Sequence, residues 1–147
     1  MRKSILYGLI FLAFLIAASN SVLAQEVSLP SADDFYKNNV DKKVYEEFDD
    51  SKLNVRKLTK VKDLPNVFNE EEWKNYPNVW KQNLKDSVIV HTKDLNPEEQ
   101  VYYFFSIKDD GEKIYIKDAM YNAKTKKISS HGQGHWTKEE FKKFEQN

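Results

Sequence analysis

The sequence predicts an α+β fold, in which N-terminal helices precede a mainly antiparallel sheet of about four strands and a short C-terminal helix packs on that sheet. Three observations support it. Residues Gln100–Asn122 alternate with the period of a strand on both sides of Asp110-Gly111, a pair that favours a tight hairpin turn. Apolar residues before this hairpin recur at helical spacing, and a helix-capping pattern follows it.

The first 24 residues have the features of a secretory signal peptide. Arg2-Lys3 is basic, Ile5 to Ala18 is an apolar run, and Ser21 and Ala24 place small residues ahead of a cleavage point before Gln25. The alternative is an uncleaved membrane anchor, but the run is shorter than the roughly 20 residues that a bilayer requires. The sequence therefore predicts an exported protein, in the periplasm or secreted, with residues 1–24 removed and residues 25–147 folded as a single α+β domain.

Charge and composition exclude several classes of partner. Without Arg2 and Lys3, the chain has 21 basic and 23 acidic residues, a net charge of −2, and Arg56 is the only arginine left. This balance argues against binding to nucleic acid or, after signal removal, to a membrane, because both need an excess of positive charge. The chain has no cysteine, so its fold cannot depend on disulfides.

Two helical segments are expected before the hairpin. Ser31 is a suitable N-cap for a helix over 32–48, and apolar residues recur in it at every fourth position. The segment 52–64 fits either a short strand or a helical turn. A second helix starts at Asn69 with Glu72 as its capping partner, and Pro77 either kinks it or begins a further helix. Trp73 and Trp80 are interpreted as a core stripe against the sheet.

The sheet is expected to comprise Ser87–Lys93, the two hairpin strands and Lys127–His131. With Asp110-Gly111 as the turn, the hairpin pairs that share its buried face are Ile107–Ile114, Phe105–Ile116 and Val101–Met120. Asp118 falls on this apolar side, where its carboxylate would need a partner or a raised pKa; a position at the sheet edge, or a bulge that turns it outward, is the favoured alternative.

The C-terminal part carries a second capping pattern. Thr137 is the expected N-cap, Glu140 its capping-box partner, and Trp136 the residue that packs onto Phe141, so a short helix follows. The passage from Lys113 through Ile128 resembles the closing hairpin of PepSY-type exported domains. Asn122 and Lys126 stand where those domains usually carry Asp and Gly, and no family assignment follows from this short stretch.

Three histidines form the candidate metal site. His131 and His135 flank Gly132-Gln133-Gly134 between the last strand and the last helix, and His91 on a neighbouring strand would supply a third nitrogen for zinc or copper. The favoured interpretation of this stretch is a flexible connector. The sequence otherwise indicates no cofactor, and no serine has the setting of a catalytic nucleophile.

The function predicted from these patterns is that of an exported non-enzymatic binding module, such as an inhibitor or a toxin-neutralising, immunity-type protein that acts through contacts with another protein. Its expected binding residues are four aromatic side chains on the second face of the hairpin: Tyr102, Phe104, Tyr115 and Tyr121. Two alternatives stay open. One is a small metal-dependent hydrolase using His91, His131 and His135, and the other is a small-ligand carrier that binds between the aromatic helix and the sheet.

Overall fold

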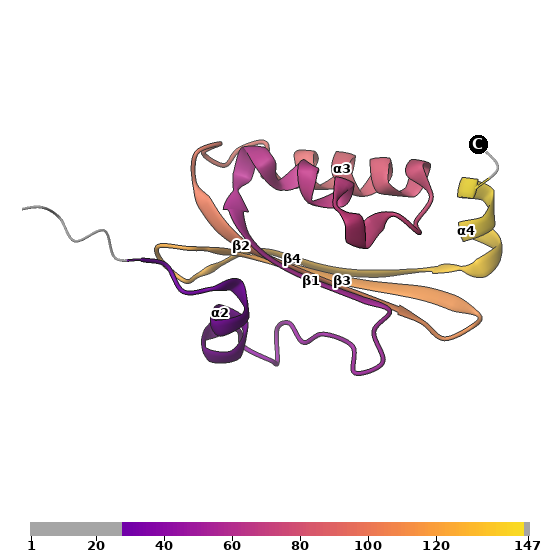
Figure 1. Cartoon of the computed structure of the whole chain (residues 1–147), viewed down its shortest axis with the longest axis horizontal. Coiled ribbons are helices and arrows are strands. Elements are labelled where there is room, and N and C mark those ends of the chain that lie inside the picture. The colour runs from indigo at the N-terminus through magenta and orange to yellow at the C-terminus, as the bar shows by residue number, and fades with distance from the viewer. Residues whose placement is uncertain (1–27, 146–147) are drawn as a thin grey trace, which may run out of the picture.

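The computed structural model describes residues 28–145, so the signal peptide predicted over residues 1–24 lies outside the described residues. The elements are α2 (Ala32–Asn39), β1 (Leu53–Lys60), the 3-10 segments η1 (Val61–Asn69) and η2 (Glu71–Trp73), α3 (Asn78–Thr92), β2 (Gln100–Asp109), β3 (Lys113–Asn122), β4 (Ile128–Thr137) and α4 (Lys138–Glu145) (Figure 1). No helix in residues 28–145 combines the length and the apolar character needed to cross a bilayer.

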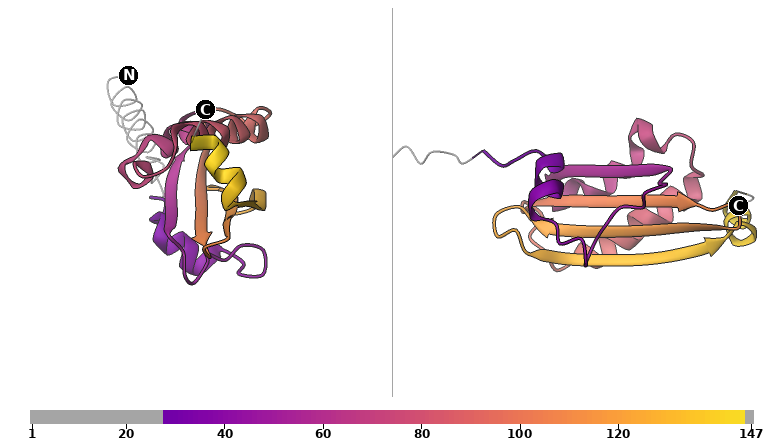
Figure 2. Two further views of the ribbon diagram at one scale, coloured as in Figure 1. Left: turned by 90° about the vertical axis from the view of Figure 1, so that its right-hand side faces the viewer. Right: turned by 90° about the horizontal axis from the view of Figure 1, so that it is seen from below.

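The four strands form one antiparallel sheet in the order β1-β2-β3-β4, which confirms the predicted α+β class. Figure 1 shows α3 and the 3-10 segments covering one face, with α4 at the end of the same side, and α2 on the opposite face. Figure 2 shows the strands side by side with β1 and β4 at the two edges. Both faces of the sheet are therefore covered, at least in part, by other segments.

The hairpin forms as predicted, but its turn lies one residue further along the chain. Gly111 has a φ of 96°, and the N–H of Asp110 donates to the carbonyl of Lys113 at 3.2 Å, so Gly111-Glu112 is the two-residue loop. Ile107 consequently faces Ile116 rather than Ile114. Moving the turn by one residue changes the cross-strand pairing by two, and a shift of two leaves every side chain on its predicted face.

The face under α3 carries the larger core. Trp73 and Trp80 lie 5.9 Å apart between ring centroids, and Trp80 packs edge-on against Phe141 of α4 at 5.4 Å. Both tryptophans are fully buried among residues of η1, α3 and the sheet, including Phe105. The interpretation of the aromatic stripe as core is thus confirmed.

The opposite face carries a second core under α2. Phe35 of α2 stacks on Tyr102 with ring centroids 3.9 Å apart, and Phe104 and Tyr121 complete the cluster. Because β2 is a central strand with one face in each core, all its residues from 101 to 107 are buried. This arrangement explains why the sequence of β2 is an almost continuous apolar run and does not alternate between apolar and polar residues.

Two expected elements are corrected. The first helix ends at Asn39 rather than at residue 48, because Val40 turns to an extended conformation and the irregular chain beyond it lets Tyr45 pack 6.0 Å from the ring of Phe104. The predicted strand Ser87–Lys93 is the C-terminal half of α3 and its cap. Its β-branched residues favoured a strand, but Val88 continues the helical stripe into the core, and Thr92 Oγ1 donates to the Val88 carbonyl at 2.8 Å.

The helix expected to start at Asn69 is also corrected: η2 follows Asn69, and the α-helix begins only after Pro77, at Asn78. Residues 52–64, left open between strand and helical turn, contribute β1 and the start of η1. The last strand runs to Thr137, so the expected connector at Gly132-Gln133-Gly134 is part of β4. The predicted capping box is confirmed: the N–H of Thr137 donates to Glu140 Oε2 at 2.8 Å, and the N–H of Glu140 donates to Thr137 Oγ1 at 3.2 Å.

Candidate functional site

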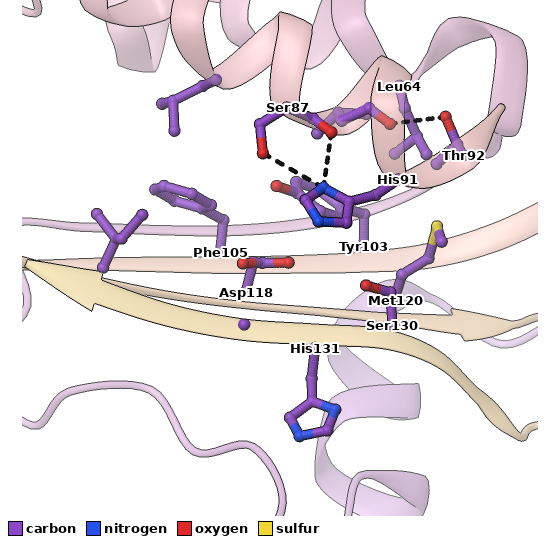
Figure 3. A pocket seen from close by; sticks show the side chains of 14 residues that line it. Leu64, Ser87, His91, Thr92, Tyr103, Phe105, Asp118, Met120, Ser130 and His131 are labelled. Carbon is purple, nitrogen blue, oxygen red and sulfur yellow. Dashed lines mark hydrogen bonds between the residues drawn. The ribbon is translucent and has the colours of Figure 1, made fainter.

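A cavity of about 90 Å³ lies between α3 and the sheet, next to the edge strand β4. It exists because the β4 residues that face α3 there are small, namely Ser130 and Gly132, and leave the space under the helix unfilled. Its walls combine apolar side chains of the larger core with a few polar groups (Figure 3). The lining residues are Leu64, Leu84, Ser87, Val88, His91, Thr92, Tyr103, Phe105, Ile116, Asp118, Met120, Ser130, His131 and Gly132.

Asp118 is placed in this cavity by the register of β3 and β4. It lies directly opposite Gly132, and a Cβ atom built on Gly132 would come within 2.8 Å of Asp118 Oδ1. The same Cβ on Gly134, two residues along the strand, would meet only Ile116 at an ordinary 3.8 Å. Gly132 therefore provides the space that the carboxylate occupies.

The carboxylate of Asp118 is largely desolvated, although the residue as a whole is only half-buried. No hydrogen bond or ion pair within residues 28–145 reaches its oxygens. Burial raises the pKa of Asp118, and the nearby His91 and His131 reduce that rise only in part. The favoured alternative, an Asp118 at the sheet edge or turned outward by a bulge, is thus wrong, because β4 lies beyond β3 and the side chain faces the core.

His91 approaches the same cavity from the helix side. Its Nδ1 lies 2.7 Å from the backbone carbonyl of Ser87 and 3.3 Å from the Ser87 hydroxyl. Since a carbonyl can only accept, Nδ1 carries the proton, and in the neutral ring Nε2 is an acceptor. Figure 3 shows the imidazole pointing from α3 toward the sheet and the carboxylate of Asp118 pointing from β3 toward the helix. The two groups face a common space without an ion pair between them.

The other polar groups of the cavity are hydroxyls. Burial, together with the charge of Asp118, raises the pKa of Tyr103 well above its usual value, so its phenol stays neutral. Ser87 and His91 are exposed and Ser130 is half-buried, which places the mouth of the cavity between the outer surface of α3 and β4. The cavity thus has apolar walls, one buried carboxylate and access to solvent.

The three histidines do not come together. His91 lies over the α3 face, whereas His131 and His135 are exposed on the other face of β4, and Figure 3 shows His131 pointing away from the cavity. Within residues 28–145, no three His, Cys, Asp or Glu side chains gather as a group that could hold a metal ion. The arrangement predicted for a zinc or copper site, with all three imidazoles converging, is therefore wrong. Side chains alternate between the two faces along β4, so Gly132 faces α3 while His131 and His135 face away from it.

The four aromatic residues expected to bind a partner also lie elsewhere than predicted. Tyr102, Phe104 and Tyr121 are buried under α2, and the Tyr102 hydroxyl donates to the Pro30 carbonyl at 2.8 Å. Tyr115 alone is half-buried, beside Phe48. This face of the hairpin is a second core rather than a contact surface, because α2 and the chain that follows it cover it.

Sequence reasoning considered Asp118 but missed Ser87, Ser130 and Gly132 as parts of one site. A usable signal existed for Gly132. Once β3 pairs with β4, a glycine opposite an inward aspartate indicates space kept for the carboxylate. No comparable signal exists for Ser87, because the segment that carries it resembles a strand.

Comparison with protein-family models, with curated proteins and with solved structures finds no match in any of the three.

Proposed function

We propose that the chain is an exported, non-enzymatic binding module that holds a small ligand in the cavity between α3 and the sheet. The observation that supports this proposal is the Asp118 carboxylate, which is half-buried against the core and has no hydrogen-bond or ion-pair partner within residues 28–145. A charge without a partner is costly to bury, and such sites are retained where a ligand completes them. The cavity joins that carboxylate to apolar walls, the usual composition of a small-molecule site.

The polar groups of the cavity favour binding over catalysis. Ser87 is the hydroxyl closest to an imidazole, at 3.3 Å from His91 Nδ1. That nitrogen already donates its proton to the Ser87 carbonyl at 2.7 Å, so it cannot accept the proton of the hydroxyl and activate it. A base that orients and deprotonates a nucleophile is the minimum for a serine hydrolase, and this pair does not provide one.

The proposed function keeps the predicted class, a non-enzymatic binding module, but replaces the predicted protein partner by a small ligand. An inhibitor or immunity-type protein was predicted from an exposed aromatic face, and the burial of Tyr102, Phe104 and Tyr121 removes that support. The small-ligand alternative, with the ligand between the aromatic helix and the sheet, coincides with the position of the cavity. Export is proposed from the features of residues 1–24.

A fragment screen followed by two matched variants tests this function. Ser130 lines the cavity, whereas its neighbour Ser129 is exposed and does not line it. Ser130→Leu fills the mouth, whereas Ser129→Leu adds the same side chain outside. We expect fragments that raise the melting temperature of the native chain and of Ser129→Leu, with the shift lost in Ser130→Leu. Equal shifts in both variants, or no fragment that stabilises the chain, would reject the cavity as the binding site.

A further inference from the structure

Resting on the proposed function, we infer that the ligand of this cavity is a small primary ammonium cation, or the ammonium end of a longer amine that extends through the mouth. The inference follows from the hydrogen-bonding character, the charge and the size of the space between Asp118 and His91.

The two groups that face each other across the space, Asp118 and His91, both offer hydrogen-bond acceptors to it. The Asp118 carboxylate has no donor from the described part of the chain, and both of its oxygens are acceptors. His91 Nδ1 is fixed as a donor to the Ser87 carbonyl, so its Nε2 offers a lone pair. An ammonium group has three donors and a positive charge, and it can serve the carboxylate and the imidazole at once.

The charge of the residues that line the cavity favours a cationic ligand. Asp118 is the acidic residue of the cavity, and none of its lining residues is a lysine or arginine. An anionic ligand would bring a second negative charge beside a carboxylate that is already poorly solvated. A bare metal ion is equally unsuited, because one carboxylate and one imidazole are fewer than the ligands that zinc or calcium requires.

The size and the walls limit the rest of the ligand. A volume of about 90 Å³ corresponds to about three water molecules and is smaller than a cavity of about 150 Å³ that accommodates benzene. Phe105 and Tyr103 present aromatic surface, and Met120 and Ile116 present flexible aliphatic surface. A short alkyl chain fits such walls, and the aromatic rings add favourable contact with a cation.

The inference is tested with three probes of matched size: n-propylammonium chloride, 1-propanol and sodium propionate. Each is titrated into ¹⁵N-labelled protein while the amide signals of Ser130 and Gly132 are followed. We expect propylammonium to bind at least about tenfold more tightly than propanol, the difference expected for a charge-assisted hydrogen bond. Asp118→Asn should abolish this preference. Asp49→Asn, which neutralises an exposed acid on the α2 side, should retain it.

The outcomes separate this inference from the proposed function. If propanol and propylammonium bind equally well at Ser130 and Gly132, or if propionate binds best, the cavity binds ligands but the ammonium assignment is wrong. If Asp118→Asn keeps the preference, Asp118 is not the group that recognises the charge, and the assignment also fails. If none of the probes shifts these amides at concentrations up to solubility, both the assignment and the proposed function are rejected.

Discussion

Replacing Gly132 by alanine tests whether this strand position must be a glycine to leave room for the Asp118 carboxylate. The added Cβ would lie 2.8 Å from Asp118 Oδ1, a separation that ordinary packing does not allow, so the carboxylate must move. Overpacking of this kind costs about 1–3 kcal/mol, and we expect the lower end, about 1 kcal/mol, because the carboxylate can rotate about its Cβ–Cγ bond.

Gly134→Ala is the matched control. It lies on the same strand and the same face, and its added Cβ would have an ordinary contact of 3.8 Å with Ile116. The gain of about 0.5–1 kcal/mol from restricting a strand glycine applies to both variants and cancels in the comparison. Gly132→Ala should therefore be less stable than Gly134→Ala by about 1 kcal/mol, which is about 0.7 M in urea midpoint for an m-value of about 1.5 kcal/mol/M.

Urea unfolding monitored by tryptophan fluorescence measures this difference, and a double-mutant cycle assigns its cause. In an Asp118→Ala background, the penalty for Gly132→Ala should disappear, because no carboxylate is left to displace. Equal midpoints for the two alanine variants, or a penalty that persists without Asp118, would refute the contact as the reason for the glycine.

Three further predictions concern the charges and the second core. Burial raises the pKa of Asp118 in the folded state, so its ionisation penalises folding above that raised pKa and not at all below the unfolded pKa of about 3.9. Asp118→Asn should raise the free energy of unfolding by about 1 kcal/mol where the carboxyl is ionised, and thermal melts at falling pH should show this gain vanishing. Phe35→Ala should cost about 3–5 kcal/mol in chemical unfolding, since Phe35 is fully buried against Tyr102, and a loss under about 1 kcal/mol would contradict a tightly packed α2. Arg56→Met should lower the free energy of unfolding by about 2 kcal/mol, because it leaves the buried Glu47 carboxylate, 2.6 Å from the guanidinium, without this partner. Lys74→Met, which breaks an exposed ion pair, should lower it by less than about 0.5 kcal/mol. Equal losses in the two variants would show that burial of the ion pair does not matter.

The elements determined by local chemistry were predictable. The Asp110-Gly111 pair located the hairpin, and the turn's displacement by one residue preserved both faces because the strand period is two. The Thr137–Glu140 capping box was also predictable, since both its partners lie within one turn of helix. In both cases the deciding contacts are between residues close in sequence.

The errors arise where distant contacts decide. The segment that contains Val88 and Thr92 has the composition of a strand, yet it is helical because Val88 packs into the same core as Trp80. The burial of Tyr102 depends on α2, about seventy residues earlier in the chain, as the stacking of Phe35 on its ring shows. No local pattern shows which helix covers which face of a sheet.

Only part of the candidate site could be predicted from the sequence, because the rest depends on contacts between distant segments. The hairpin alone put Asp118 on the inner face and raised the question of its partner. Its glycine neighbour and the imidazole above it depend on the pairing of β3 with β4 and on α3 being a helix. A strand predicted to end at His131 places Gly132 in a connector, and only the metal-site alternative uses the neighbouring histidines as ligands, whereas β4 continues to Thr137.

The position of the cavity beside β4 determines how the pocket can be altered. β4 is hydrogen-bonded to β3 on one side and has no strand on its other side in residues 28–145, so its displacement disrupts a single ladder. Substitutions at its cavity-facing position Ser130 can widen or narrow the opening while the tryptophan-rich and tyrosine-rich interiors stay intact. The same scaffold can therefore diversify toward ligands of different length by changes confined to one outer strand.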